Sequence, residues 1–357
     1  MNKFLKLFSF VIFCILAAYL CVFPSRGLRA ASDGITLCIS SVIPALFPYL
    51  VCSGVLSKSY GARLLGHWLS PVMRPLFGIS GAGALPLVLG LLSGYPVGAV
   101  CTKDLFISGA ISRDEANRLI AFCNNSGPVF VISVVGIGFL HSQRLGVILY
   151  ISHIISAVVT GKLLGVFSRN KAQGEKLLPQ AFGEEGLLGG FLLAFDAAVL
   201  CILKICGFVV FFSVLASMLD CLPVSSVFHS LIEITGGLRS FTSQFPKSPL
   251  CLGAVSFFLA FSGLSVVLQV CAVTAPSGLD LRPYLIGKIL QGGFSFVFTY
   301  LVVSANSQLV SATQKSTAVA AACPLDAFSN SLTMIFFTVL ILLSVCLAVW
   351  LFKRLVS

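Results

Sequence analysis

The sequence predicts an all-α, polytopic transmembrane protein, and three observations carry this prediction. Hydrophobic residues make up 57% of the 357 residues, charged residues only 10%, and the mean hydropathy is +1.03. A soluble domain carries about 25% charged residues, so this composition cannot cover a water-facing surface. The apolar residues are gathered in runs that reach or approach the ~20 residues needed to cross a bilayer. Cytosolic enzymes, nucleic-acid-binding proteins and secreted disulfide proteins are disfavoured on the same grounds.

The net charge of +11 and the thirteen cysteines fit this class. Basic residues stand in short connections between apolar runs, as they do in cytoplasmic loops and at interfacial anchors. An anionic substrate is a second reason for a basic excess. The cysteines form no Cys-x-x-Cys pair, and most lie inside apolar runs, where cysteine acts as a small hydrophobic residue. We therefore expect no metal site and no nucleic-acid partner.

We expect eight to ten spans, beginning with a transmembrane helix within residues 1–30. Its apolar run, 4–23, follows Lys3 and Lys6. A signal peptide is the competing interpretation, but this run is long and no cleavage site follows it. The further apolar runs are 35–56, 82–100, 119–140, 145–167, 190–219, 250–273, 283–304 and 330–352. Whether 82–100 and 250–273 span or turn back sets the count. The shorter amphipathic segments 61–77 and 225–240 suit interfacial or re-entrant helices.

Two halves of the chain match at a constant separation of 169 residues, as from Gly94 to Gly263. The same offset relates Gly109 to Gly278 and Arg113 to Arg282, and the order of elements recurs around these positions. We therefore expect two related, inverted repeats, because paired interrupted segments at equivalent places are typical of transporters. The predicted organisation is a first repeat at 31–167, a cytoplasmic linker at 168–189, a second repeat at 190–305, and a C-terminal segment with the last transmembrane helix at 306–357.

The first candidate binding segment is Ser93-Gly94-Tyr95-Pro96, in the middle of an apolar run. Pro96 lacks an N–H and Gly94 removes side-chain constraints, so a helix should break here. Broken backbone at membrane depth is tolerated only inside protein or beside a wet cavity. We predict that Ser93, Gly94 and Tyr95 contact a substrate. The alternative is a proline kink packed against a neighbouring helix.

The second candidate segment is Asn124-Asn125-Ser126-Gly127-Pro128. Its carboxamides and hydroxyl are costly in hydrocarbon unless they are hydrogen-bonded. Gly127-Pro128 should expose the N-terminal amides of the run from Val129, and such a helix end favours carboxylate or phosphate. We predict Asn124, Asn125 and Ser126 as binding residues. The alternative is an ordinary turn outside the membrane, which this sequence would also form.

The third candidate segment is the second-half counterpart, with Ser262, Gly263, Ser265 and Gln269, followed by Gln291-Gly292-Gly293-Phe294-Ser295. It offers hydroxyls and carboxamides but no proline, so the two halves differ at the site. Ser265 and Gln269 are one helical turn apart and share a face. The alternative is that these small residues only allow close helix packing.

Four ionisable residues in apolar surroundings, Arg74, Asp196, Lys204 and Glu233, are further functional candidates. The four histidines are dispersed, and nucleotide-binding and zinc-protease motifs are absent from the sequence. No nucleophile and base can be paired from the sequence. We therefore expect no enzymatic activity and no cofactor.

Four segments carry a resemblance to a known family: GLLSGYPVGA (90–99), FCNNSGPVF (122–130), FLAFSGLSVVLQV (258–270) and YLIGKILQ (284–291). The chain resembles the YlbJ-like sporulation integral membrane proteins, which carry the nucleoside-recognition (Gate) domain. The resemblance implies a duplicated architecture like that of concentrative nucleoside transporters, in a bacterial cell membrane. It also implies a role in moving dipicolinate, an aromatic dicarboxylate, toward the forespore.

The leading functional hypothesis is a secondary transporter, or permease, for a small organic anion such as dipicolinate. Access to the substrate would alternate as one repeat moves against the other. Two alternatives stay open: a nucleoside-type permease, and a non-transporting membrane partner in a sporulation or envelope complex. The expected partners are the anionic substrate and the lipid bilayer, and the sequence leaves homo-oligomerisation open.

Overall fold

The computed structural model describes residues 3–57, 60–167, 186–219 and 226–306, and this part of the chain is helical without strands. The predicted final helix at 330–352 and most of the predicted linker, 168–185, lie outside the described residues. The helices are α1 (Lys3–Val22), α2 (Pro24–Leu37), α3 (Ile43–Ser57), α4 (Tyr60–Phe77), α5 (Ala84–Ser93), α6 (Val97–Ile107), α7 (Arg113–Cys123), α8 (Gln143–Val166), α9 (Gly186–Leu219), α10 (Ser226–Ile232), α11 (Ile234–Gln244), α12 (Pro249–Phe261), α13 (Gly263–Thr274) and α14 (Arg282–Ala305). Four short elements complete the fold: the π-helices η1 (Cys38–Val42) and η3 (Val129–Phe139), and the 3₁₀ turns η2 (Gly81–Gly83) and η4 (Ala275–Ser277).

The described residues contain four stretches long and apolar enough to cross a bilayer, and two strongly bent helix pairs raise this number to six. A polytopic, all-α membrane protein is thereby confirmed. The number is smaller than the eight to ten spans expected, because several predicted runs form short helices, such as Leu46–Leu56 and Val129–Phe139, and because the predicted run 330–352 lies outside the described residues. The four long stretches are Gln143–Val166, Leu188–Leu219, Pro249–Ser277 and Arg282–Ala305.

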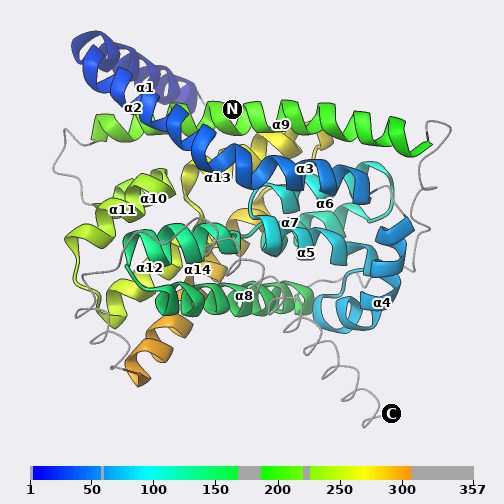
Figure 1. Cartoon of the computed structure of the whole chain (residues 1–357). Coiled ribbons are helices and arrows are strands. Elements are labelled where there is room, and N and C mark those ends of the chain that lie inside the picture. Colours follow the sequence, from blue (N-terminus) through cyan, green and yellow to red (C-terminus); the bar gives the residue numbers. More distant parts are fainter. Residues whose placement is uncertain (1–2, 58–59, 168–185, 220–225, 307–357) are drawn as a thin grey trace.

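The long helices α8 and α9 lie on opposite sides of the molecule, with the shorter helices between them (Figure 1). α9 packs against α2, α3 and α13, whereas α8 packs against α14, α7 and η3. The segments α5–α7 and α12–α13 lie between them, and α14 packs on α8 with one face inward.

The predicted run 82–100 turns back on itself and does not span. α5 ends at Ser93, Gly94 has φ of +100°, and α6 begins at Val97 after Pro96. The two helices then pack side by side so closely that a Cβ on Gly90 would lie 3.2 Å from the Cα of Gly98. Gly94 is needed here because a side chain disfavours this backbone conformation.

The helix that follows, α7, has well-defined ends. It begins with a capping box, in which the Ser112 hydroxyl accepts the N–H of Glu115 and the Glu115 carboxylate accepts the N–H of Ser112. The other carboxylate oxygen of Glu115 accepts the N–H of Ser80 at 2.7 Å, which fixes α7 against the segment before η2. α7 ends at Cys123, residues 124–127 are not helical, and η3 follows.

The second half is broken at Glu233 and at Ser262. The predicted amphipathic segment 225–240 forms two helices, α10 and α11, because Glu233 leaves the helical conformation and caps α11 with its side chain. α12 and α13 meet at Ser262, whose φ of +75° is unusual for a residue other than glycine. α14 runs without a break from Arg282 to Ala305.

α14 is polar on its buried face and apolar on its exposed face. The buried polar residues follow one another at spacings of four, three, four and four: Tyr284, Lys288, Gln291, Ser295 and Thr299. The exposed face carries large apolar residues: Leu285, Ile286, Ile289, Val297 and Leu301. This arrangement suits a helix whose outer face contacts lipid and whose inner face lines a polar interior.

The positions that define the predicted repeats have similar backbone conformations. Gly94 and Gly263 both have positive φ, of +100° and +74°, as do Gly109 and Gly278, of +74° and +64°. Arg113 and Arg282 are both the first residue of a helix. These similarities support the duplication, whose repeat boundaries stay a prediction.

Candidate functional site

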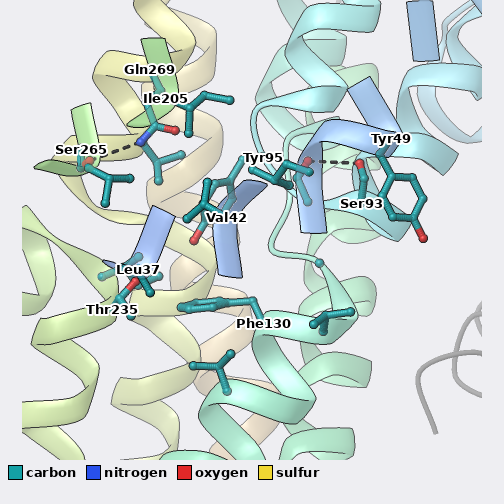
Figure 2. Close-up of a pocket in the computed structure, with 18 of the residues that line it drawn as sticks. Leu37, Val42, Tyr49, Ser93, Tyr95, Phe130, Ile205, Thr235, Ser265 and Gln269 are labelled. Atoms are coloured by element: carbon teal, nitrogen blue, oxygen red, sulfur yellow. Dashed lines mark hydrogen bonds between the residues drawn. The ribbon is translucent and has the colours of Figure 1, made fainter. Parts of the chain in front are cut away.

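A pocket of about 150 Å³ lies where the broken helices meet, and Figure 2 shows the side chains around it. One side is formed by the α5–α6 turn, with Ser93, Gly94 and Tyr95. The opposite side is formed by α13, with Ser265 and Gln269. The pocket therefore lies between the α5–α6 turn and α13, the helix that follows the break at Ser262.

The first turns of four helices surround this pocket. Gly94 and Tyr95 directly precede α6, Gly127 and Val129 stand at the start of η3, and the beginnings of α11 and α13 contribute residues 233–235 and 265–266. The first N–H groups of a helix have no partner within the helix, and they carry partial positive charge. Helix starts that converge on one pocket produce an environment that favours anionic groups.

One of the four helix starts already has an acidic group. Glu233 lines the pocket, and its carboxylate accepts the N–H of Thr235 at 2.9 Å and of Gly236 at 2.6 Å. The side chain is buried, with an exposed fraction of 8%. Glu233 is the acidic residue among the pocket-lining residues, and the lining includes neither lysine nor arginine. Any attraction of the pocket for an anion would therefore have to come from backbone amides.

The remaining wall of the pocket is apolar and aromatic. It comes from α2, η1, α3 and α9 on one side and from η3 on the other. Tyr49 and Phe130 contribute aromatic rings, and Ile205 and Val209 contribute branched side chains from α9. Apolar walls with a few polar groups are typical of small-molecule sites.

Two of the predicted segments contact each other through glycine. A Cβ on Gly127 would lie 2.6 Å from the carbonyl oxygen of Ser93, and a Cβ on Gly94 would lie 2.9 Å from the nitrogen of Gly127. The two breaks therefore approach backbone to backbone, which only glycine permits.

Five of the ten predicted binding residues line the pocket: Ser93, Gly94, Tyr95, Ser265 and Gln269. The Ser93 hydroxyl donates to the carbonyl of Leu89 at 2.5 Å, and it keeps its acceptor lone pairs. The carboxamide nitrogen of Gln269 donates to the Ser265 hydroxyl at 3.3 Å. These two side chains are one turn apart on α13, as the sequence predicts.

The other five predicted residues are buried outside the pocket lining. Asn125 points toward α14: its Nδ2 donates to the Phe122 carbonyl at 2.8 Å, and its Oδ1 accepts Nε2 of Gln291 at 2.7 Å. The hydroxyl of Ser126 donates to the carbonyl of Leu259 in α12 at 2.9 Å. These side chains connect the first-half break to the second half of the chain.

Asn124, Ser262 and Gly263 complete the set. Nδ2 of Asn124 donates to the hydroxyl of Tyr284 at 3.4 Å. The Ser262 hydroxyl forms long bonds, of 3.4 Å, to carbonyls of its own helix. Gly263 faces the last carbonyls of α10, which a Cβ would approach to 3.4–3.5 Å. Its role in this arrangement is close packing.

Three buried residues that the sequence did not single out belong to the same polar cluster. The N–H of Ser126 donates to Nε2 of His153 in α8 at 3.1 Å, and Nζ of Lys288 donates to Oε1 of Gln291 at 3.0 Å. The third is Tyr284, the partner of Asn124. The polar spacing along α14 is the signal that could have identified Lys288 and Tyr284.

The candidate ionisable residues are widely separated. Glu233 lines the pocket, whereas Arg74, Asp196 and Lys204 are exposed on α4 and α9. Within the described part of the chain, no group of three or more His, Cys, Asp or Glu side chains could hold a metal ion.

One known relative decides the family. Over 330 aligned positions, covering 81% of each chain, the sequence is 30% identical to the sporulation integral membrane protein YlbJ of Bacillus subtilis (strain 168). The chain belongs to the YlbJ family. No family model and no solved structure matches it. As a YlbJ-family member it is a multi-pass protein of a bacterial membrane, and its relative's name connects that family with sporulation.

Proposed function

We propose that this YlbJ-family protein is a secondary transporter that moves a small aromatic organic anion, with dipicolinate as the first candidate, by alternating access between the two repeats. The supporting observation is the pocket into which the starts of four helices converge. Backbone amides at these starts would hold the carboxylates, and the aromatic and branched walls would hold the ring.

The size of the pocket favours a solute with a single ring. A cavity of about 150 Å³ in another protein accepts one benzene molecule, and this pocket has the same volume. A pyridine ring with two carboxylates is larger than benzene but smaller than a nucleoside, which carries both a base and a ribose. The bent and broken helices around the pocket are elements that could adjust as the solute enters and leaves.

A nucleoside-type permease is the second candidate, and Glu233 is the observation that favours it. A carboxylate on the wall of the pocket accepts hydrogen bonds from hydroxyl groups and repels a dicarboxylate. Both Glu233 oxygens already accept backbone N–H groups of α11, which offsets part of this repulsion. The pocket volume favours dipicolinate, whereas Glu233 favours a nucleoside. Competition between the two solutes in one transport assay would decide between them.

The test is counterflow of radiolabelled dipicolinate into proteoliposomes that contain the purified full chain and excess unlabelled dipicolinate. We expect Val209→Trp to abolish counterflow, because the indole would occupy the pocket. Leu203→Trp is the matched control on the same helix, since its side chain faces outward with an exposed fraction of 62%. Equal counterflow in the two variants would remove the pocket from the transport path.

Competition separates the candidate functions. Inhibition of dipicolinate counterflow by small aromatic dicarboxylates, and not by uridine, supports the proposed anion transporter. Inhibition by uridine, together with uridine counterflow, would favour the nucleoside permease. The absence of any counterflow, with a second membrane protein co-purifying in equal amounts, would favour the non-transporting partner in a sporulation complex.

A further inference from the structure

Lys288 is a lysine buried in the interior of a membrane protein. It lies in α14, and its exposed fraction is 0%. It cannot extend to the membrane surface, as lysines near helix ends commonly do. Its one hydrogen bond in the described structure goes from Nζ to Oε1 of Gln291, at 3.0 Å, on the same helix.

The charge of this side chain has no counter-ion among the described residues. An ammonium group offers three N–H donors, and here only one has an acceptor. A buried charge without an opposite charge is strongly disfavoured, and the usual resolution is loss of the proton. No salt bridge involving Lys288 occurs in the described part of the chain. The burial of Lys288 and the lack of an opposite charge therefore favour the neutral amine.

Two other titratable groups lie within electrostatic range of Lys288: Cys123 at the end of α7 and His153 in α8. α12, which also packs on α14, brings the Ser256 hydroxyl to Ser295, and its one titratable residue, Cys251, lies nearer the far end of that contact. No carboxylate faces Lys288 from these helices.

Two atoms of this cluster are buried without a hydrogen-bond partner among the described residues: Nδ1 of His153 and Oδ1 of Asn124. Nε2 of His153 accepts the N–H of Ser126, so the proton of a neutral ring is on Nδ1. A buried donor, a buried acceptor and a lysine amine with free capacity thus occur in one cluster. Buried polar atoms without partners are rare and call for an explanation.

The cluster is connected to the pocket through the break at residues 124–127. Lys288 binds Gln291, and Gln291 binds Asn125. Two residues further on, Gly127 lines the pocket and contacts Ser93 and Gly94. A solute that displaces this break moves Asn125, and with it the hydrogen-bonding environment of Lys288.

We propose that Lys288 is the proton-binding residue that couples solute movement to a proton gradient across the membrane. This proposal rests on the proposed transport of an organic anion. With the pocket empty, Lys288 is a neutral amine. When the anion binds, its negative charge offsets the cost of a buried ammonium, so the amine takes up a proton from the solution on the side to which the pocket is open. Solute and proton are then released together on the other side.

The decisive experiment compares two kinds of transport in the same proteoliposomes with radiolabelled dipicolinate. Counterflow exchanges solute for solute and needs no net proton movement, whereas accumulation driven by an imposed pH gradient does. We expect Lys288→Gln to keep counterflow. We also expect its accumulation of dipicolinate to be the same with and without an imposed pH gradient. Lys204→Gln is the matched control, because this lysine is exposed on another membrane helix. It should keep gradient-driven accumulation.

The outcomes are distinguishable. Without counterflow in the unmodified protein, the proposed function fails, and this inference with it. With counterflow in the unmodified protein and undiminished gradient-driven accumulation in Lys288→Gln, this inference alone fails. Lys288→Met keeps the side-chain length, and both variants should be monodisperse in detergent, because a neutral residue replaces a neutral amine. Loss of folding in both would overturn the inference too.

A second measurement does not depend on transport. Addition of dipicolinate to the purified protein in weakly buffered detergent solution should raise the pH as the protein takes up a proton. This change should be absent in Lys288→Gln at the same solute occupancy. A pH rise of equal size in the variant would assign the proton to another group.

Discussion

One stretch of the predicted repeat is broken in the first half and continuous in the second half. In the first half the chain leaves the helix at residues 124–127 and begins again as η3. In the second half the equivalent residues, 293–296, lie in the middle of the continuous helix α14. Gly127 and Pro128 correspond to Phe296 and Val297. Proline lacks an N–H and glycine favours non-helical backbone, so these two differences favour a break in the first half and a continuous helix in the second.

The two halves are complementary in their hydrogen bonding. The break at residues 124–127 presents carboxamides and backbone groups outside a helix. The polar side chains on the buried face of α14 form hydrogen bonds with the carboxamides. The bonds from Gln291 to Asn125 and from Asn124 to Tyr284 both cross between the halves. A broken helix inside a membrane is stable only when such partners are present. The comparison therefore predicts that changes in the first-half break act on the whole fold, and changes in the second half act locally.

A substitution in the close contact between α5 and the end of α7 should give the largest loss of stability. In Gly90→Ala the new Cβ would overlap the carbonyl oxygen of Cys123 at the end of α7. Backbone atoms cannot yield as a flexible side chain can, so we expect a loss of more than about 3 kcal/mol. Gly293→Ala in α14 meets nothing within 4 Å and should be neutral or stabilising. Thermal unfolding in detergent would compare them, and equal melting temperatures would refute the contrast.

Loss of the hydrogen bond between Gln291 and Asn125 should give the next largest loss of stability. Asn125→Leu removes the partner of Gln291, and a buried carboxamide without a partner costs about 1–3 kcal/mol. Adding Gln291→Leu removes the second carboxamide too, so the double variant should lose less than the sum of the single losses. The measurement is a double-mutant cycle of thermal stability. Strict additivity would show that the two residues are not coupled.

The acidic cap of α11 places a negative charge on the wall of the pocket. Glu233→Gln keeps an oxygen for the α11 amides and removes a negative charge from the pocket. If the solute is a dicarboxylate, its affinity should rise on the order of tenfold, because like charges in a partly buried site repel by about 1–3 kcal/mol. Binding of dipicolinate measured by calorimetry is the test. Weaker binding would contradict anion selectivity and favour the nucleoside permease.

The smallest effect concerns the second-half break. Ser262 adopts a left-handed conformation with φ of +75°, and its hydroxyl forms only long bonds to carbonyls. Ser262→Gly removes the steric cost of that conformation and should raise stability by up to about 1 kcal/mol. A decrease in melting temperature would mean that the Ser262 hydroxyl contributes more than its distances indicate.

The sequence predicts the class, the apolar runs and the position of the first-half breaks, because each depends on local chemistry. Pro96 and Pro128 each lie within two residues of a glycine, and the two residue types together favour non-helical backbone, so the breaks at 94–96 and 124–127 follow from local sequence. The absence of proline from the second-half candidate segments, 261–269 and 291–295, likewise indicates that the two halves differ. The break at Glu233 is harder to predict, since glutamate is a good helix former and acts here as a cap only because α10 ends against Gly263.

The direction in which the polar side chains point could not be predicted from local sequence. Asn125 and Ser93 look equivalent in the sequence, yet Ser93 lines the pocket and Asn125 binds α14. That difference depends on which helices pack on each side of the break. Lys288 was not singled out because a lone lysine near the start of an apolar run usually lies at the membrane interface. Only its four-and-three spacing with other polar residues indicates an inward position.

The inward polar face of α14 has a consequence for biogenesis. A single lysine in a membrane helix disfavours insertion by about 3 kcal/mol, and α14 adds glutamine and hydroxyl groups on the same side. The segment therefore gains by entering the lipid as a pair with a helix that has already been synthesised. α12 is synthesised before it, with only α13 and η4 between them, and binds it through Ser256, Ser295 and Thr299. The translocon thus receives α14 together with its first partner.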